Sequence, residues 1–265
     1  MKIVCLKGGL GNQMFEYCRF RDLMESGHDE VYLFYDHRRL KQHNGLRLSD
    51  CFELELPSCP WGVKLVVWGL KICRAVGVLK RLYDDEKPEA VLIDDYSQHR
   101  RFIPNARRYF FFRQFLAELQ SGFVQMIRAV DYPVSVHVRR GDYLHPSNSS
   151  FGVCGVDYFQ QAIAYVRKKR PDARFFFFSD DMEWVRENLW MEDAVYVEHT
   201  ELLPDYVDLY LMTLCRGHII SNSTFSFWGA YLAVDGNGMK IYPRRWFRDP
   251  TWTSPPIFSE EWVGL

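Results

Sequence analysis

The chain has 265 residues, 48% of them hydrophobic and 25% charged, which suits one large or two modest globular domains. A net charge of −1 offers nucleic acid no overall attraction, and we expect no nucleic-acid partner. The seven cysteines are scattered without metal-binding or redox spacing, which predicts reduced thiols. Neither a signal peptide nor an apolar run of about 18 residues is present. We therefore expect a soluble cytoplasmic protein, with attachment to the inner face of a membrane as the alternative.

The first apolar segment, residues 2–6, leads directly into a glycine-rich turn and a helix predicted from Met14 to Met24. This layout aims backbone N–H groups and the positive end of a helix at an anion. The spacing matches neither the dinucleotide fingerprint nor the P-loop, so a simple tight turn is the alternative. The residues at this turn that we expect to bind substrate are Gly9, Gly11, Asn12 and Gln13, the two amides being suited to sugar hydroxyls and phosphate.

A second strand is predicted over 31–35, a long helix over 61–82 and a third strand over 91–93. The helix has a basic arc and an apolar arc, whose members are Lys64, Lys71, Arg74 and Arg81, and Leu65, Trp68, Ile72, Ala75, Val76 and Leu79. Such a helix either packs on a sheet or lies on an anionic membrane surface. A break before Pro133 places the domain boundary near 125–132, which gives domains 1–128 and 129–265.

Residues 133–143 begin as a buried parallel strand and end abruptly in charge, with His137, Arg139, Arg140 and Asp142. In open α/β sheets, ligands bind at the carboxyl ends of the strands. Two adjacent guanidiniums suit phosphate, because each offers a planar fork of donors. The alternative interpretation is a solvated basic turn at a strand end.

The remainder of the chain alternates helices with strands, which predicts right-handed βαβ units and a parallel sheet. The predicted helices are 158–169, 182–189, 206–215 and a helix that continues through Tyr231, and the predicted strands are 174–178, 194–197, 218–220 and 240–242.

Two further predicted strands also end in polar clusters, at 179–181 and 221–226. In a doubly wound sheet these clusters and the one at 137–142 would meet in one crevice. Arginines and a hydroxyl-rich helix start suit a diphosphate, while carboxylates suit ribose or guanine. The sequence contains no Asp-x-Asp motif for a divalent cation, so we expect a nucleotide site without a metal or other cofactor.

Four motifs resemble those of the α-1,2-fucosyltransferases of glycosyltransferase family 11, in the order of that family. They are GGLGNQMF at 8–15, HVRRGDY at 137–143, FSDD at 178–181 and SNSTFSFWGA at 221–230, and the tail at 243–247 with Trp262 is similar too. The resemblance implies an α/β, GT-B-like architecture of two Rossmann-like domains that face a central cleft. It also implies an inverting, metal-independent transfer of fucose from GDP-fucose to the O2 hydroxyl of a terminal galactose, with a galactose-terminated glycan as acceptor.

The resemblance also implies roles for individual residues. Arg139 is expected to grip the β-phosphate and stabilise the departing GDP. Asp142 is our candidate for the general base because it lies near this arginine, and the alternative is that it orients Arg139. His137 is expected at the nucleoside and Asp208 at the guanine, and Asn12 is expected to reach fucose and phosphate from the first domain.

The remaining candidates have weaker assignments. Ser223, Thr224 and Ser226 are expected near the diphosphate, and Arg140 is a secondary contact. Asp180 either binds substrate or caps the helix that follows it, and a solvated surface carboxylate is the alternative for Asp208. A GT-B enzyme with another nucleotide sugar, and a non-catalytic nucleotide- or glycan-binding protein, are the competing functions. The sequence leaves the oligomeric state open.

Overall fold

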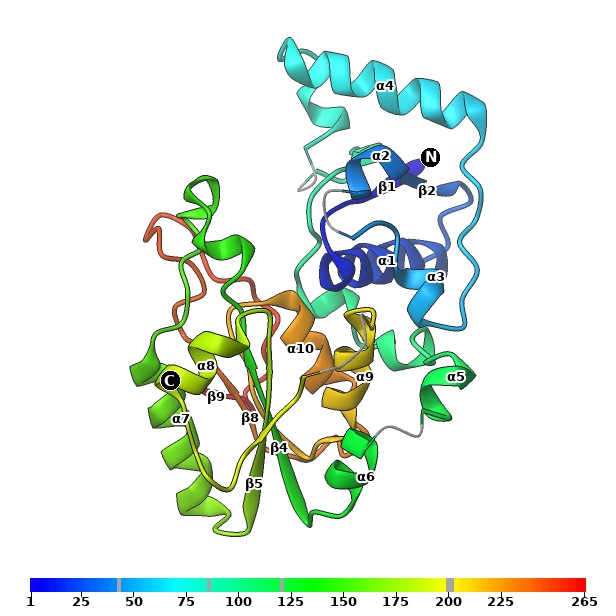
Figure 1. Cartoon of the computed structure of the whole chain (residues 1–265). Helices are drawn as coiled ribbons and strands as arrows, with labels where there is room; N and C mark the ends of the chain where they lie inside the picture. Colours follow the sequence, from blue (N-terminus) through cyan, green and yellow to red (C-terminus); the bar gives the residue numbers. More distant parts are fainter. Residues whose placement is uncertain (42–43, 85–86, 120–121, 199–202) are drawn as a thin grey trace. The chain divides into compact units, whose positions relative to one another are not determined.

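A computed structural model describes residues 1–41, 44–84, 87–119, 122–198 and 203–265 (Figure 1). The chain forms two compact units, Met1–Arg113 and Gln114–Leu265. The sequence placed the boundary after residue 128, but α5 (Gln114–Ala117) and α6 (Gly122–Arg128) belong to the second unit. The reason is that α6 buries Val124 and Ile127 and packs against α9 (Tyr206–Leu214).

The first unit is built on a parallel three-stranded sheet in the order β2-β1-β3 (Figure 1). Its strands are β1 (Lys2–Leu6), β2 (Val31–Tyr35) and β3 (Leu92–Ile93), which confirms the three predicted strands. Its helices and 3₁₀ turns are α1 (Leu10–Glu25), α2 (His37–Leu40), α3 (Leu48–Cys51), α4 (Trp61–Ala75), η2 (Lys80–Leu82), η3 (Arg100–Phe102) and η4 (Ala106–Arg108). Helices α1 and α4 lie on opposite sides of the sheet.

Helix α1 begins at Leu10, four residues before its predicted start at Met14. Gly9 is extended and serves as the N-cap, and its carbonyl oxygen accepts hydrogen bonds from the N–H groups of Asn12 and Gln13. Gly8 has φ +69°, a left-handed conformation in which a side chain is strained. The glycine loop therefore leads straight into the first turn of α1.

Helix α4 is shorter than predicted, because it ends at Ala75 and the chain turns through Gly77, with φ +74°, and Leu79, with φ +54°. Its buried side chains pack on β1 and β3 in a core that contains Val63, Val67 and Leu70 from the helix and Ile3, Cys5 and Leu92 from the strands. The helix therefore packs on a sheet, but through a face other than the predicted apolar arc.

The second unit contains a parallel six-stranded sheet in the order β6-β5-β4-β7-β8-β9. The strands are β4 (Tyr132–Val138), β5 (Ala173–Ser179), β6 (Val195–Tyr196), β7 (Gly217–Ile219), β8 (Lys240–Tyr242) and β9 (Val263–Gly264). The other elements are α7 (Val156–Lys169), α8 (Met182–Asn188), α9, α10 (Thr224–Tyr231), η5 (Asp142–Leu144) and η6 (Pro146–Asn148). The predicted alternation of strands and helices is confirmed, but the sequence predicted neither the two-residue β9 nor the helices α5 and α6.

The strand order reverses between β4 and β7. From β4 the chain adds β5 and β6 on one side, then returns to place β7, β8 and β9 on the other. Helices α7 and α8 share a hydrophobic core with one face of the sheet, and α9 and α10 lie on the other side (Figure 1). The carboxyl ends of β4 and β7 therefore flank the switch point at which doubly wound sheets bind their ligands.

Among the residues described, no helix is both long and apolar enough to cross a membrane. None of the seven cysteines, all of which the structure describes, is paired in a disulfide, and four of them are buried.

Candidate active site

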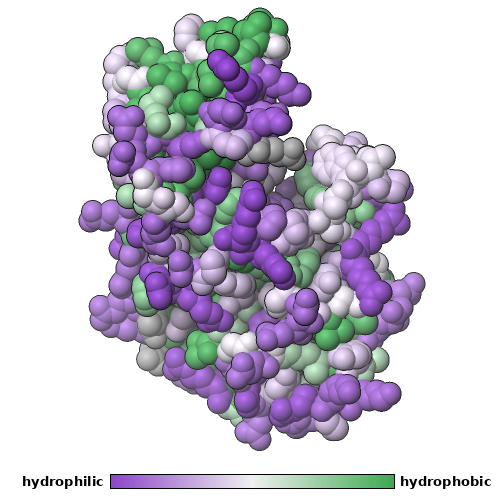
Figure 2. Space-filling model, turned by 180° about the vertical axis from the view of Figure 1, so that it is seen from behind, coloured by the Kyte–Doolittle hydropathy of each residue, from purple (hydrophilic) through white to green (hydrophobic). Residues whose placement is uncertain are grey.

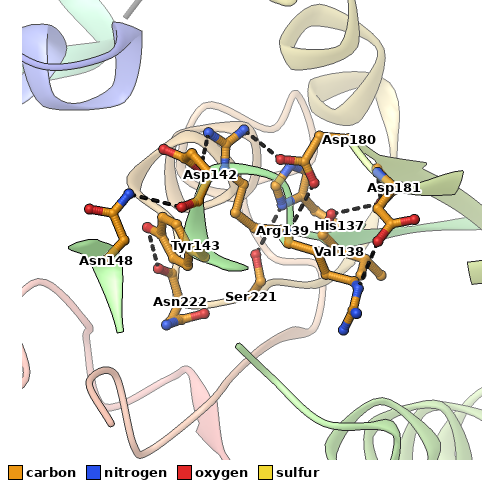
Figure 3. Close-up of polar contacts among 12 residues, drawn as sticks. His137, Val138, Arg139, Asp142, Tyr143, Asn148, Asp180, Asp181, Ser221 and Asn222 are labelled. Carbon is orange, nitrogen blue, oxygen red and sulfur yellow. Dashed lines mark hydrogen bonds and ion pairs between the residues drawn. The ribbon is translucent and has the colours of Figure 1, made fainter. Parts of the chain in front are cut away.

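The guanidinium of Arg139 lies between two carboxylates at the carboxyl end of β4 (Figure 3). Its Nη2 donates to Asp142 Oδ1 at 2.7 Å, and its Nη1 lies 3.0 Å from Asp180 Oδ2. Burial alone would lower the pKa of Arg139, but these carboxylates raise it. The ring of Tyr143 lies 5.7 Å from the guanidinium carbon. Arg139 is thus a fixed cation held by neighbours from two different strand ends.

Arg140 is directed elsewhere. Its Nε donates to Asp181 Oδ2 at 2.9 Å, and its guanidinium stacks 4.0 Å from the ring centre of Trp184. The backbone N–H of Arg140 donates to Asp180 Oδ1 at 2.9 Å. The two adjacent arginines therefore have different partners, and the side chain of Arg140 braces the start of α8.

The alternative that Asp180 caps α8 is wrong, since Asp181 is the capping residue. Asp181 Oδ1 accepts a hydrogen bond from the N–H of Trp184 at 3.2 Å. Asp180 instead faces Gly141, where an added Cβ would stand only 2.5 Å from its Oδ2 atom. A glycine at position 141 is what lets this carboxylate approach the turn after β4.

His137 joins the two strands of the switch point. Its Nδ1 lies 3.0 Å from Ser221 Oγ, beyond the end of β7 (Figure 3). Its ring centre lies 5.6 Å from that of Phe225. Burial, followed by the charge of Arg139, lowers the pKa of His137 to about 3. The imidazole is therefore neutral near pH 7 and bonds without carrying charge. This contact and the pairs of Arg139 bring together all three polar strand ends, as the sequence predicted.

The hydroxyl cluster after β7 forms the start of α10. Ser223 is the N-cap residue and is buried, while Thr224 is half-buried at the first helical position. Ser226 donates its hydroxyl to the carbonyl of Ser223 at 3.0 Å, so it braces the turn. The first-turn N–H groups of α10 lie at the switch point, the kind of place where helices bind anions.

Asp208 occupies the first turn of α9 and is half-buried. Helix α9 packs against α10, which places Asp208 in the same unit as the Arg139 cluster. Its predicted role at a guanine stays a prediction.

The glycine loop of the first unit is braced largely from within. Gln13 is buried, and its amide donates to the carbonyls of Gly8 and Gly45, both at 2.9 Å, and accepts from the N–H of Arg47 at 3.1 Å. Asn12 Oδ1 accepts from Gln98 at 2.9 Å. The structure thus gives Gln13 a structural task, and substrate binding by Gly9, Gly11 and Asn12 stays a prediction.

Sequence reasoning did not single out Glu16, which fixes the same loop. This carboxyl is fully buried on α1, and its Oε2 accepts from the N–H of Lys7 at 2.8 Å. Burial raises its pKa well above the usual value. The signal in the sequence is an acidic residue between Phe15 and Tyr17, but the sequence does not show that its partner is the N–H of Lys7.

Two more residues of the motifs organise the second unit. Burial raises the pKa of Tyr143 to about 12, so its phenol stays protonated and donates to the carbonyl of Asn222 at 3.1 Å. The side-chain amide of Asn222 in turn donates to the carbonyls of Phe151, Gly152 and Trp246 at 3.2, 3.3 and 2.9 Å. Asn148 donates to the carbonyl of Asp142 at 2.8 Å.

A cavity of about 590 Å³ lies beside Tyr143 and Asn222. Aromatic side chains and arginines line it, among them Phe151, Phe247, Arg245 and Arg248. Aromatic faces flanked by hydrogen-bonding side chains suit sugar rings. In the part of the chain that the structure describes, no three His, Cys, Asp or Glu side chains gather as metal ligands.

Comparisons with known proteins also point to a glycosyltransferase. Residues 105–265 match the family model described as "Glycosyl transferase family 11". An Escherichia coli alpha-1,2-colitosyltransferase is 27% identical, over 98% of this chain and 97% of its own. The human galactoside alpha-(1,2)-fucosyltransferase 1 is 32% identical, over 54% of this chain and 42% of its own.

Among solved structures, the NodZ alpha-1,6-fucosyltransferase co-crystallised with GDP superposes with a TM-score of 0.55 at 16% identity, covering 88% of this chain and 92% of NodZ. This likeness shows a shared GT-B-like α/β fold, as the sequence predicted. The family match, which covers more than half of this chain, shows that the chain is a glycosyltransferase that belongs to glycosyl transferase family 11.

Proposed function

We propose that this protein transfers L-fucose from GDP-β-L-fucose to the O2 hydroxyl of a terminal galactose, with inversion at the fucose carbon and without a metal ion. The observation that carries the proposal is Arg139, a cation fixed at the switch point of a doubly wound sheet. The names of the relatives, which include an α-1,2-colitosyltransferase and a galactoside α-(1,2)-fucosyltransferase, support the linkage and the acceptor.

The second unit supplies a binding site suited to GDP. Arg139 donates one N–H of Nη2 to Asp142 and forms an ion pair with Asp180 through Nη1, and a guanidinium has five N–H groups in all. The β-phosphate would take the remaining donors, and the first-turn N–H groups of α10, with Ser223 and Thr224, would contact the diphosphate. Asp208, in the first turn of α9, would contact the guanine. Neutral His137 holds the ends of β4 and β7 together through its contact with Ser221.

The reaction breaks the bond between fucose C1 and the β-phosphate oxygen, and the bonding electrons leave with GDP. Positive charge develops on the sugar ring in an oxocarbenium-like transition state, while the acceptor oxygen attacks the opposite face. Arg139 stabilises the negative charge that grows on the diphosphate, which is worth about 3–4 kcal/mol for one well-placed donor. With the guanidinium of Arg139 in this role, the step requires no metal cation.

The proton of the acceptor hydroxyl passes to a base, for which we propose Asp142. The structure also shows Asp142 holding Arg139, so the two roles need separate tests. Asp142→Asn retains an oxygen for Arg139 but removes the base, and a general base is worth about 10²–10⁴ in rate. A loss in that range assigns Asp142 as the base, whereas a loss below about tenfold leaves it as the group that orients Arg139.

A second donor is favoured by one observation, the likeness to a colitosyltransferase over nearly the whole chain. Colitose is fucose without its 3-hydroxyl group, so the two donors differ in a single hydrogen-bonding position. We would supply GDP-fucose, GDP-colitose, GDP-mannose and UDP-galactose with galactose-terminated acceptors, in the presence of EDTA, and identify the products by mass spectrometry and NMR.

An α-1,2-fucosylated product formed in EDTA is the expected result. Preference for GDP-colitose would replace the donor, and inactivity that a divalent cation restores would overturn the metal-independent mechanism. Tight GDP binding without turnover of any donor would instead support a non-catalytic binding protein.

A further inference from the structure

Helix α4 has two apolar faces on opposite sides. One face, formed by Val63, Val67 and Leu70, is buried against the first sheet. The other, which we call the outer face, is exposed and consists of Trp61, Leu65, Trp68, Ile72 and Val76. Figure 2 shows hydrophobic residues gathered at the top of the view, over the segment that Figure 1 labels α4.

The outer face is unusual in the size of its side chains. Trp61 and Trp68 are 73% and 68% exposed, and the turn after the helix adds Val78 and Leu79, at 49% and 51%. A helix repeat of 3.6 residues places the outer-face positions 61, 65, 68 and 72 on one side, away from the sheet. A contiguous exposed apolar surface of this kind is typical of a site that binds another protein, a ligand or a membrane.

The charged side chains of the segment that contains the outer face are all positive. Between residues 56 and 83 the chain has five basic residues and no acidic one. Among these, Lys64 on α4 and Lys80 and Arg81 on η2, the turn that follows it, are exposed. Lys71 and Arg74 are turned toward Asp94, 4.0 and 3.5 Å away.

We propose that the outer face of α4 binds the surface of an anionic lipid bilayer, with the helix lying in the plane of the interface. Leucine, isoleucine and valine side chains would enter the acyl boundary, and the two tryptophans would occupy the headgroup level that their amphipathic rings favour. The basic side chains keep their charges at the level of the anionic headgroups. This inference is independent of the donor and acceptor proposed above.

The charge pattern favours lipid over a protein partner. The cores of protein interfaces are depleted in lysine, whereas interfacial membrane helices combine tryptophan and leucine on one face with basic residues beside them. Docking of α4 would hold the glycosyltransferase at a membrane surface. Transfer to a water-soluble galactoside would not depend on it.

The test uses the full chain in sedimentation with two kinds of vesicle, phosphatidylglycerol mixed with phosphatidylethanolamine, and phosphatidylcholine alone. We expect binding to the anionic vesicles to be at least about tenfold tighter, and to weaken as salt is raised. Trp61→Ser with Trp68→Ser should lower that binding at least about tenfold while transfer to a soluble galactoside is retained. The matched control is Trp190→Ser, which removes a tryptophan that is 63% exposed on the second unit.

A charge test complements the aromatic one. Lys64→Gln, Lys80→Gln and Arg81→Gln together should abolish the preference for anionic vesicles, whereas Lys168→Gln with Lys169→Gln, at exposed positions of α7, should leave it unchanged. Absence of vesicle binding by the unaltered chain would overturn the proposal, as would equal binding by the tryptophan variant. A dimer in size-exclusion chromatography that the tryptophan changes dissociate, without vesicle binding, would show that a second copy covers the outer face.

Discussion

Replacing Arg139 should greatly reduce catalysis while it changes the stability of the fold only slightly. Arg139→Ala removes the cation from a site where one well-placed donor is worth about 3–4 kcal/mol, so kcat/KM should fall by about 10²–10³. The structure limits the cost to folding. The two ion pairs that are lost involve Asp142 and Asp180, whose side chains are 45% and 27% exposed, and such pairs contribute at most about 1 kcal/mol each. The melting temperature should therefore fall by only a few degrees, about 2–4 °C per kcal/mol.

The assay is release of GDP from GDP-fucose, with titration of GDP to measure its dissociation constant. Arg139→Lys keeps the charge but replaces the planar fork, so we expect an intermediate loss of about tenfold to a hundredfold. Arg167→Ala is the matched control, because it breaks an exposed ion pair with Asp193, whose atoms lie 2.8 Å apart. Near-normal transfer by Arg139→Ala, or an unchanged affinity for GDP, would refute the phosphate-gripping role.

Three further results are expected from the same geometry. Gly141→Ala should displace the Asp180 carboxylate, since its new Cβ would stand 2.5 Å from Oδ2, and should lower kcat/KM at least about tenfold with little change in thermal unfolding. Glu16→Gln keeps an acceptor oxygen for the glycine loop; because burial raises the pKa of Glu16, the native protein should lose stability relative to this variant as pH rises above about 4.5 in urea unfolding. Burial lowers the pKa of His137 and His218 to about 3, so the unfolded chain binds more protons below pH 6.5. Stability should then fall by about 1.4 kcal/mol per pH unit for each histidine between pH 6.5 and 3, and equal stability at pH 4 and pH 7 would contradict the burial argument.

The fold and the meeting of the strand ends follow from local pattern. The apolar run that becomes β4 is buried at every position, and a polar side chain placed at its carboxyl end has to lie near its counterparts from β5 and β7 once the strands are parallel. That is why the contact between His137 and Ser221, 84 positions apart, could be anticipated from the alternation of elements alone.

The sequence could not assign hydrogen-bond and ion-pair partners to individual side chains of the same type. Asp180 and Asp181 are adjacent and chemically identical. In the structure Asp180 lies against Gly141 and pairs with Arg139, whereas Asp181 caps α8, and the sequence alone does not tell the two apart. The amide of Gln13 was expected to face substrate, but its partners include Arg47, far along the chain and invisible to a local pattern.

For helix α4 the sequence did not identify which face is buried. With apolar side chains around most of its circumference, periodicity could not tell which face meets the sheet, and the arc chosen from the sequence is the exposed one. The domain boundary also moved, because the sequence does not show that α6 packs against α9.

The amide of Asn222 has a consequence for the order in which parts of the second unit open. It bonds to the loop at Phe151 and Gly152 and to the tail at Trp246, and the N–H of Arg248 donates back to Ser150 at 2.9 Å. Segments cross-linked in this way open as one cooperative unit, so their amide hydrogens should exchange with solvent at a common rate. Trimming the C-terminal tail would then loosen the wall of the cavity beside Tyr143 while leaving β4 and its arginine protected.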